Sequence, residues 1–113
     1  MTASPSDPLL DLRDALRRFA DERDWDQFHS PKNLAAALAV EVAELLEHYQ
    51  WSETAAEPAK VREELADVLL YLIRLADKLD IDLAAAARDK IALNAQKYPV
   101  EKSRGNARKY TAL

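Results

Sequence analysis

The stretch AKVREELADVLLYLIRLADKL, residues 59–79, decides the fold of this chain. Its apolar residues recur at intervals of three and four, a spacing that predicts an α-helix. A helix that is apolar on several sides is buried on several sides. In a domain this small, such a helix predicts an oligomer. The broad apolar stripe consists of Val61, Leu65, Val68, Leu69, Leu70, Leu72, Ile73, Leu75 and Leu79.

The segments on either side of this helix are also helical in pattern, and none alternates with the period of two typical of strands. We expect further helices over about residues 8–22, 31–50 and 83–98, joined by a turn at 23–30 and a linker at 51–58. Ser6 or Asp7, Ser30 and Asp82 are suited to cap their N-termini. Residues 100–113 are expected to form an irregular tail. The pattern predicts an all-α four-helix bundle in a single domain, residues 1–113.

The composition excludes several classes of function. Hydrophobic residues make up 49% of the chain and charged residues 32%, which is typical of a globular protein. The absence of cysteine excludes disulfides, thiolate metal sites and a cysteine nucleophile, and the single glycine excludes a glycine-rich phosphate loop. The net charge of −4 argues against a nucleic-acid partner. Because neither a membrane span nor a signal peptide is visible, we expect a cytoplasmic protein with no membrane partner.

An acidic pair on the helix expected at 31–50 faces inward. Leu34, Leu38 and Leu45 form the apolar sector of that helix, and Glu41 lies only about 20° outside it. Glu44 lies about 60° further round, on the flank of the same stripe. A carboxylate buried without a partner costs several kcal/mol, so a glutamate among leucines needs an explanation.

The helix at 59–79 carries a matching pair, with Glu64 on the flank of its stripe and Asp67 one turn on. A single pair of this kind usually faces solvent, but two matched pairs on successive helices favour a shared site. If the helices pack antiparallel, the four carboxylates converge and repel one another unless a hard cation joins them. Mg²⁺ takes oxygen ligands and retains positions for water and substrate phosphates. The two pairs therefore predict a magnesium site.

The cationic residues near the C-terminus and the two tryptophans each have a structural and a functional interpretation. Lys90, Asn94 and Lys97 share one face of the last helix within about 60°, with Tyr98 beside them. That stripe is either simply solvated or, facing the metal site, a clamp for a triphosphate. Trp25, close to His29, and Trp51 lie at helix edges. They either anchor loops or form a slot in which a nucleobase stacks.

In its ordered motifs the chain resembles the all-α nucleotide pyrophosphohydrolases of the MazG type, and within them the dCTP pyrophosphatases. The family motif of ExxE, a spacer and ExxD is present as EVAE at 41–44 and ELAD at 64–67. One departure is Leu16, where a related enzyme carries histidine. The similarity also covers ERDWDQFHSPKN at 22–33, EVAELLEHYQW at 41–51, EELADVLLYL at 63–72, NAQKYP at 94–99 and SRGNARKYTAL at 103–113.

This resemblance implies a Mg²⁺-dependent enzyme that cuts dCTP, or a modified dCTP, to dCMP and pyrophosphate and so cleanses the nucleotide pool. It also implies a homotetramer, arranged as a dimer of dimers. A water with a lowered pKa would attack the α-phosphorus, with Glu41 or Glu44 orienting or deprotonating it. The same reaction on dUTP or another deoxynucleotide stays open, as does a non-catalytic helical interaction module. The candidate metal ligands are Glu41, Glu44, Glu64 and Asp67, and the candidate substrate contacts are Trp25, His29, Trp51, Tyr71, Lys90, Asn94, Lys97 and Tyr98.

Overall fold

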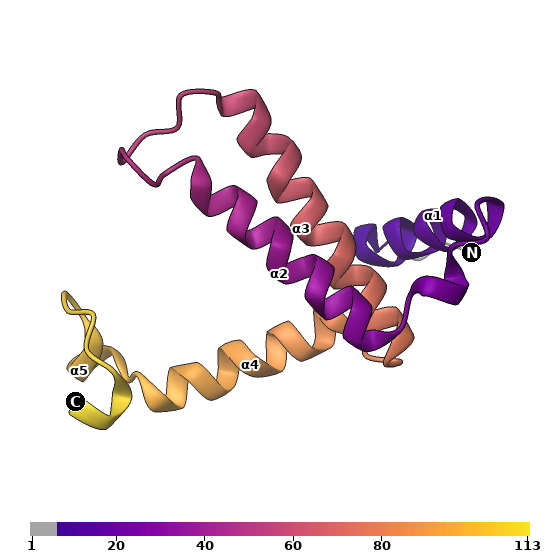
Figure 1. Cartoon of the computed structure of the whole chain (residues 1–113). Helices are drawn as coiled ribbons and strands as arrows, with labels where there is room; N and C mark the ends of the chain where they lie inside the picture. Colours follow the sequence, from indigo (N-terminus) through magenta and orange to yellow (C-terminus); the bar gives the residue numbers. More distant parts are fainter. Residues whose placement is uncertain (1–6) are drawn as a thin grey trace, which may run out of the picture. The chain divides into compact units, whose positions relative to one another are not determined.

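The computed structural model describes residues 7–113, and this part of the chain contains five α-helices and no strand (Figure 1). The all-α class expected from the sequence is confirmed. The chain divides into two compact units, one ending at Ile81 and the other comprising Asp82–Leu113. The helices are α1 (Pro8–Glu22), α2 (Pro31–Glu47), α3 (Pro58–Lys78), α4 (Leu83–Lys97) and α5 (Val100–Ser103).

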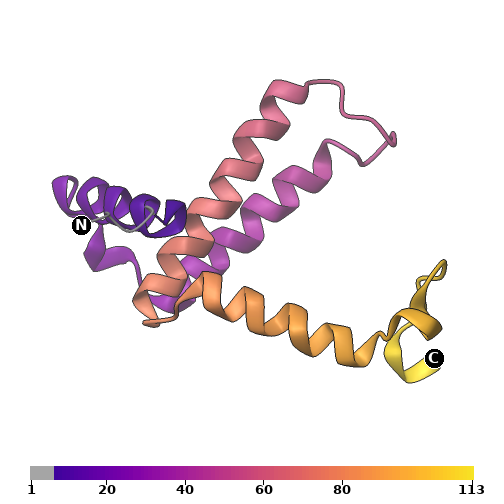
Figure 2. The ribbon, with the colours of Figure 1, turned by 180° about the vertical axis from the view of Figure 1, so that it is seen from behind.

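The first unit is built on an antiparallel hairpin of α2 and α3, which lie side by side in both views (Figures 1 and 2). Helix α1 packs against α3 near the end of the hairpin where α2 begins. The buried apolar residues of the unit are few and come from all three helices: Ala20, Leu34, Ile73 and Ala76. A core this thin leaves much of the hairpin surface open to further contacts.

The helix starts follow the capping residues read from the sequence. The Asp7 carboxylate accepts a hydrogen bond from the backbone N–H of Leu9 at 2.9 Å and so caps α1. The Ser30 hydroxyl caps α2 and the Asp82 carboxylate caps α4, each by accepting from the N–H three residues on, at 3.1 and 3.0 Å. Each cap satisfies at least one of the backbone donors left free in a first turn, and Asp7 also accepts from the N–H of Leu10. Ser6, the alternative cap of α1, lies outside the described residues.

The end of α2 and the C-terminal tail differ from the expectation. Helix α2 stops at Glu47 rather than near residue 50, because the next three backbone N–H groups bond to carbonyls only three residues back. This tighter pattern is common at helix ends. The tail at 100–113 is not irregular throughout, since it contains α5 and a 3₁₀ turn over Tyr110–Ala112. Pro99, which ends α4, also leads into α5, so the described chain has five helices rather than four.

Large apolar side chains are exposed along the hairpin. On α2 the exposed fractions are 56% for Val40, 47% for Val42 and 66% for Leu46, and on α3 Leu65 is 53% exposed. Exposed apolar surface of this extent is typical of a contact face. None of the described helices is long and apolar enough to cross a membrane.

Candidate active site

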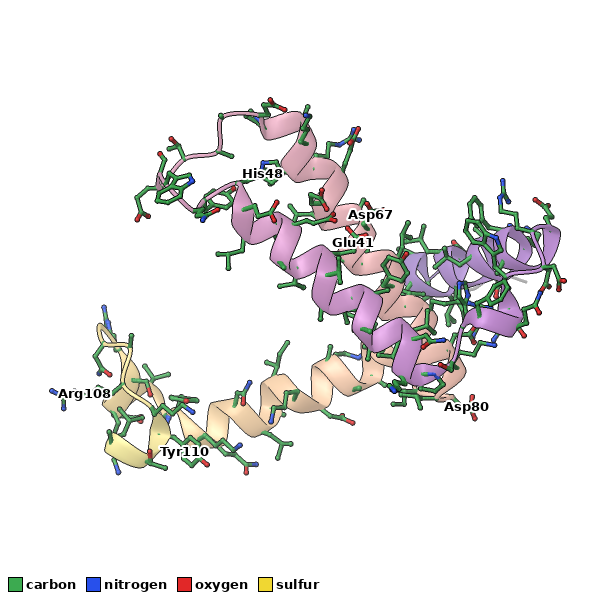
Figure 3. All side chains as sticks on the ribbon, viewed as in Figure 1. Glu41, His48, Asp67, Asp80, Arg108 and Tyr110 are labelled. Carbon is green, nitrogen blue, oxygen red and sulfur yellow. The ribbon has the colours of Figure 1, made fainter. Side chains whose placement is uncertain are left out.

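Three carboxylates meet midway along the α2–α3 hairpin. Glu41 of α2 and Glu64 and Asp67 of α3 each offer an oxygen, and these oxygens lie within 4.8 Å of one another. Figure 3 shows Glu41 and Asp67 close together between the two helices. Antiparallel pairing produces this meeting, because it sets the middle of α2 against the middle of α3. Glu44 follows one turn later on α2 and is half-buried, but it is not one of the three.

The cluster is electrostatically incomplete. The Oε2 atoms of Glu41 and Glu64 are sealed from solvent and have no hydrogen-bond partner among residues 7–113. Burial, reinforced by the neighbouring Glu64, Glu44 and Asp67, raises the pKa of Glu41 to about 7. Buried oxygens without donors are costly for a protein, and they are the ligands that a hard divalent cation prefers. The donor set therefore fits Mg²⁺.

The pKa of Glu41 predicts how stability depends on pH in the absence of metal. The folded-state pKa of about 7 lies above the ordinary value of 4.5, so between these pH values the folded chain holds a proton that the unfolded chain releases. The free energy of unfolding should therefore fall as pH rises through this window. We expect Glu41→Gln to melt about 5 °C above wild type at pH 8, with a much smaller difference at pH 5.

Thermal unfolding in a chelator measures this difference. Glu63→Gln is the matched control, because Glu63 is the exposed neighbour of Glu64 on α3. Added magnesium should raise the melting temperature of wild type more than that of Glu41→Gln, since only the native site binds it with full ligand strength. A wild-type protein that is the more stable of the two at pH 8 without metal would contradict this account of Glu41.

A hollow of about 430 Å³ lies beside the carboxylates, with Asp67 in its wall. Trp25 stands at its edge, with its ring centroid 5.6 Å from that of Phe19 and 6.5 Å from that of His29, both edge-on. Such a space, mostly apolar with a few polar groups, is typical of a pocket for a planar ring. Its walls come from α1, the turn at residues 23–30 and α3, namely Leu12, Ala15, Leu16, Phe19, Trp25, His29, Asp67, Leu70, Tyr71 and Arg74.

Ion pairs hold the turn at residues 23–30, here called the aromatic turn, against α3. The Arg74 guanidinium donates to Asp26 at 2.7 Å, and Lys78 also donates to this carboxylate. The hydrogen bond from Lys78 is the main cause of a lowered pKa at Asp26. On the far side, Arg17 of α1 donates to Asp77 at 2.8 Å. Because these pairs link α1, the turn and α3, they fix the wall of the hollow to which Trp25 belongs.

Trp51 occupies a different place. It is 89% exposed and lines a separate hollow of about 360 Å³, formed by the end of α2, the linker and the start of α3. Trp25 precedes α2 and Trp51 follows it, so a helix of 17 residues, about 25 Å long, separates them. One chain does not bring the two tryptophans together. Their sharing of a base stays a prediction that requires a second copy of the chain.

The second unit carries the residues that are expected from the sequence to contact the phosphates. Lys90, Asn94 and Lys97 lie exposed on α4, and Tyr98 directly follows that helix. The Tyr110 ring packs against the C-terminal end of this group, with its centroid 5.0 Å from the Lys97 ammonium and 6.0 Å from the Tyr98 ring centroid. The tail thus orders the end of α4. The approach of these residues to the carboxylates stays a prediction.

Sequence reasoning named Trp25, His29, Asp67 and Tyr71 but missed the other residues that line the hollow. Arg74 was not recognised, although a cation within an apolar stripe is a signal of a buried ion pair. It lies three residues after Tyr71 and seven after Asp67, which places all three on one face of α3. Phe19 of α1 gave no signal, because an apolar residue on a helix does not reveal which helix it meets, whereas Leu16 stood out only as a departure from a related enzyme with histidine there.

The comparisons with known proteins agree with this geometry. The model of the MazG-like family matches residues 36–113. The chain is 47% identical over 119 residues to dCTP pyrophosphatase 1 of Rattus norvegicus and 44% identical over 120 residues to that of Homo sapiens. Each alignment covers 97% of this chain and 70% of the relative. The crystal structure of a pyrophosphatase from Archaeoglobus fulgidus is similar, with a TM-score of 0.80 and 38% identity over 88% of this chain and 99% of the other.

Proposed function

The chain belongs to the MazG-like family, and from this premise we propose that it converts dCTP and base-modified dCTP to dCMP and pyrophosphate with Mg²⁺. The chain is a nucleotide pyrophosphohydrolase; the proposal concerns its substrate and its metal. The observation that supports the proposal most strongly is that carboxylate oxygens of Glu41, Glu64 and Asp67 lie within 4.8 Å of one another. Asp67 also lines a hollow that is suited to a base. That arrangement would place a triphosphate at the carboxylates while its nucleoside enters the hollow.

The carboxylates Glu41, Glu44, Glu64 and Asp67 would hold the metal. Magnesium, when bound, would offset the charge of the triphosphate and lower the pKa of a nearby water. We propose that Glu41 acts as the general base and accepts the proton of the water that attacks the α-phosphorus. Glu41 is suited to this role because its carboxylate lies beside those of Glu64 and Asp67, so that one group can accept a proton while its neighbours hold the metal.

The nucleoside would be bound by the walls of the hollow. Trp25 would stack on the base, and Tyr71, one turn after Asp67 on α3, would contact the sugar. Stacking alone is worth about 1–3 kcal/mol and hardly distinguishes bases. Selectivity must therefore come from the size of the hollow and from hydrogen bonds to the base edge, since a polar group left unpaired by the wrong base costs enough to reject it.

A panel of deoxynucleotides tests the substrate assignment. Pyrophosphate release should be measured with dCTP, 5-methyl-dCTP, dUTP, dTTP, dATP and dGTP, each with Mg²⁺. The proposal requires the highest kcat/KM for dCTP or its 5-substituted form. A preference for dUTP or a purine nucleotide would overturn the cytosine assignment and keep the reaction. Release from none of them would contradict a deoxynucleoside triphosphate as the substrate.

The α4 cations give a further prediction. We expect Lys90→Ala and Lys97→Ala each to lower kcat/KM for the triphosphate by about tenfold or more, because each cation would offset charge on the phosphates. Arg88→Ala is the matched control, since Arg88 carries the same charge on the opposite face of α4. A loss in Arg88→Ala as large as that in Lys90→Ala would rule out a clamp confined to one face.

Assembly is the remaining part of the proposal. We propose a homotetramer, supported by the exposed apolar residues of the hairpin such as Val40, Leu46 and Leu65. In such an assembly, the Trp51 of one copy would lie beside the hollow that contains Trp25 of another copy. Sedimentation equilibrium at micromolar concentration should give about four times the mass of one chain. A stable folded monomer under these conditions would contradict the assembly.

A further inference from the structure

Arg74 makes one contact that its ion pairs do not explain. Its side chain is 7% exposed and donates to Asp26 at 2.7 Å and to Asp77 at 3.4 Å. Its third bond runs from Nε to the ring nitrogen Nδ1 of His29, at 3.1 Å. The two carboxylates accept from the terminal nitrogens, so His29 accepts the remaining Nε–H of this buried guanidinium, and the bond also constrains the histidine.

The bond determines which nitrogen of His29 carries its proton. Arginine has only donors and stays protonated, so the Nδ1 that faces it must be bare. A neutral His29 then carries its proton on Nε2. Protonation of Nδ1 would set two donors against each other, and burial together with the charges of Arg74 and Lys78 lowers the pKa of His29 accordingly.

The protonated nitrogen is free for a ligand. His29 lines the 430 Å³ hollow, and its Nε2 has no hydrogen-bond partner among residues 7–113. Unlike the Oε2 atoms of Glu41 and Glu64, this nitrogen is not sealed from solvent. His29 therefore keeps one donor that is fixed by the protein, accessible and unused.

We propose that Arg74 is a positioning residue that holds His29 as a fixed Nε2–H donor for an acceptor atom of the nucleoside. The acceptor is a carbonyl or ring nitrogen of the base, or an oxygen of the sugar. The ligand class rests on the function proposed above, whereas the state of His29 does not. A fixed donor adds discrimination that stacking on Trp25 cannot, because a group that presents a hydrogen there leaves the donor unpaired.

The first test observes the hydrogen bond directly in the full-length protein without nucleotide. With ¹⁵N-labelled arginine and histidine, NMR at pH 8 should show scalar coupling between Arg74 Nε and His29 Nδ1, and His29 should be protonated at Nε2. The spectrum of His48→Gln assigns the signals, because the chain has two histidines. A proton on Nδ1 of His29, or no coupling, would overturn the proposal whether or not the chain turns over any nucleotide.

Paired variants add a comparison of the two arginines. Arg74→Met should release His29 to a mixture of both protonated forms. Arg17→Met cuts the same chain of ion pairs at Asp77 without touching His29 and should leave its proton on Nε2. An unchanged His29 in a folded Arg74→Met would overturn the positioning role. If Arg74→Met does not fold, the wild-type coupling still decides.

The second test measures what the donor does for the substrate. His29→Phe keeps a ring and removes the donor, and His29→Gln keeps an amide donor at a similar reach. We expect His29→Phe to raise KM for dCTP about five- to tenfold with kcat little changed, and His29→Gln to recover part of the loss. Equal KM values for His29→Phe and wild type would overturn the contact with substrate.

The same ratio of KM values, taken with the base-free deoxyribose 5′-triphosphate, separates the two sources of the acceptor. A ratio near one with this compound assigns the acceptor to the base. A ratio equal to that for dCTP assigns it to the sugar. A wild-type protein that hydrolyses neither compound would refute the proposed function, while the NMR result on Arg74 and His29 would stand.

Discussion

Glu41→Gln is expected to lower kcat/KM for dCTP at least about a hundredfold while the fold is retained. The substitution keeps the size of the side chain and removes both its charge and its capacity to accept a proton. Glu41 carries two of the proposed roles, and its Oε2 is one of the two buried carboxylate oxygens that have no hydrogen-bond partner in the described chain. Steady-state kinetics at saturating magnesium measure the loss, and circular dichroism establishes the fold.

The other three carboxylates should behave alike. We expect Glu44→Gln, Glu64→Gln and Asp67→Asn each to lose activity by orders of magnitude, since each would weaken the hold on the metal. Glu63→Gln is the control, because it removes an exposed charge from the same turn of α3. Near-wild-type turnover in two or more of the four variants would remove the basis of the proposed site.

Trp25→Ala is expected to raise KM for dCTP roughly 5- to 150-fold, which corresponds to a stacking contribution of about 1–3 kcal/mol. Trp25 stands at the edge of the hollow against Phe19 and His29, so its ring is oriented by its neighbours before a ligand arrives. The kcat should change less, because the tryptophan would bind the base and not the reacting phosphate.

Phe28→Ala is the matched control for this effect. Phe28 belongs to the same turn, is 60% exposed and does not line the hollow. Its loss should leave KM within about twofold of wild type, as is usual for exposed positions. If Phe28→Ala and Trp25→Ala raise KM equally, the turn acts as a whole and Trp25 is not a stacking surface.

The fold and the acidic cluster were predictable because both depend on local periodicity. Apolar residues at intervals of three and four located the helices, and capping residues such as Ser30 and Asp82 located their starts. The same periodicity turned Glu41 toward the core. From the sequence, the meeting of the carboxylates is conditional on antiparallel packing, and the α2–α3 hairpin meets that condition and sets Glu41 against Glu64 and Asp67.

The hollow was less predictable because it depends on contacts between residues far apart in the sequence. Arg74 reaches His29 across 45 positions, and Arg17 reaches Asp77 across 60. No spacing within one helix reveals such pairs. From the sequence, Trp25 and Trp51 are both aromatic residues at helix edges, but the full length of α2 separates them in the structure. The sequence pattern specified which face each helix buries, and only the packing decided what that face meets.

Identification of the products of dCTP hydrolysis tests the central claim most directly. Wild-type protein should be incubated with dCTP and magnesium in ¹⁸O-water, with Glu41→Gln as the blank, and the products analysed by mass spectrometry. The account predicts equal amounts of dCMP and pyrophosphate, no reaction in a chelator, and a strongly reduced yield from Glu41→Gln. Formation of dCDP and phosphate, or turnover that persists unchanged in Glu41→Gln, would contradict it.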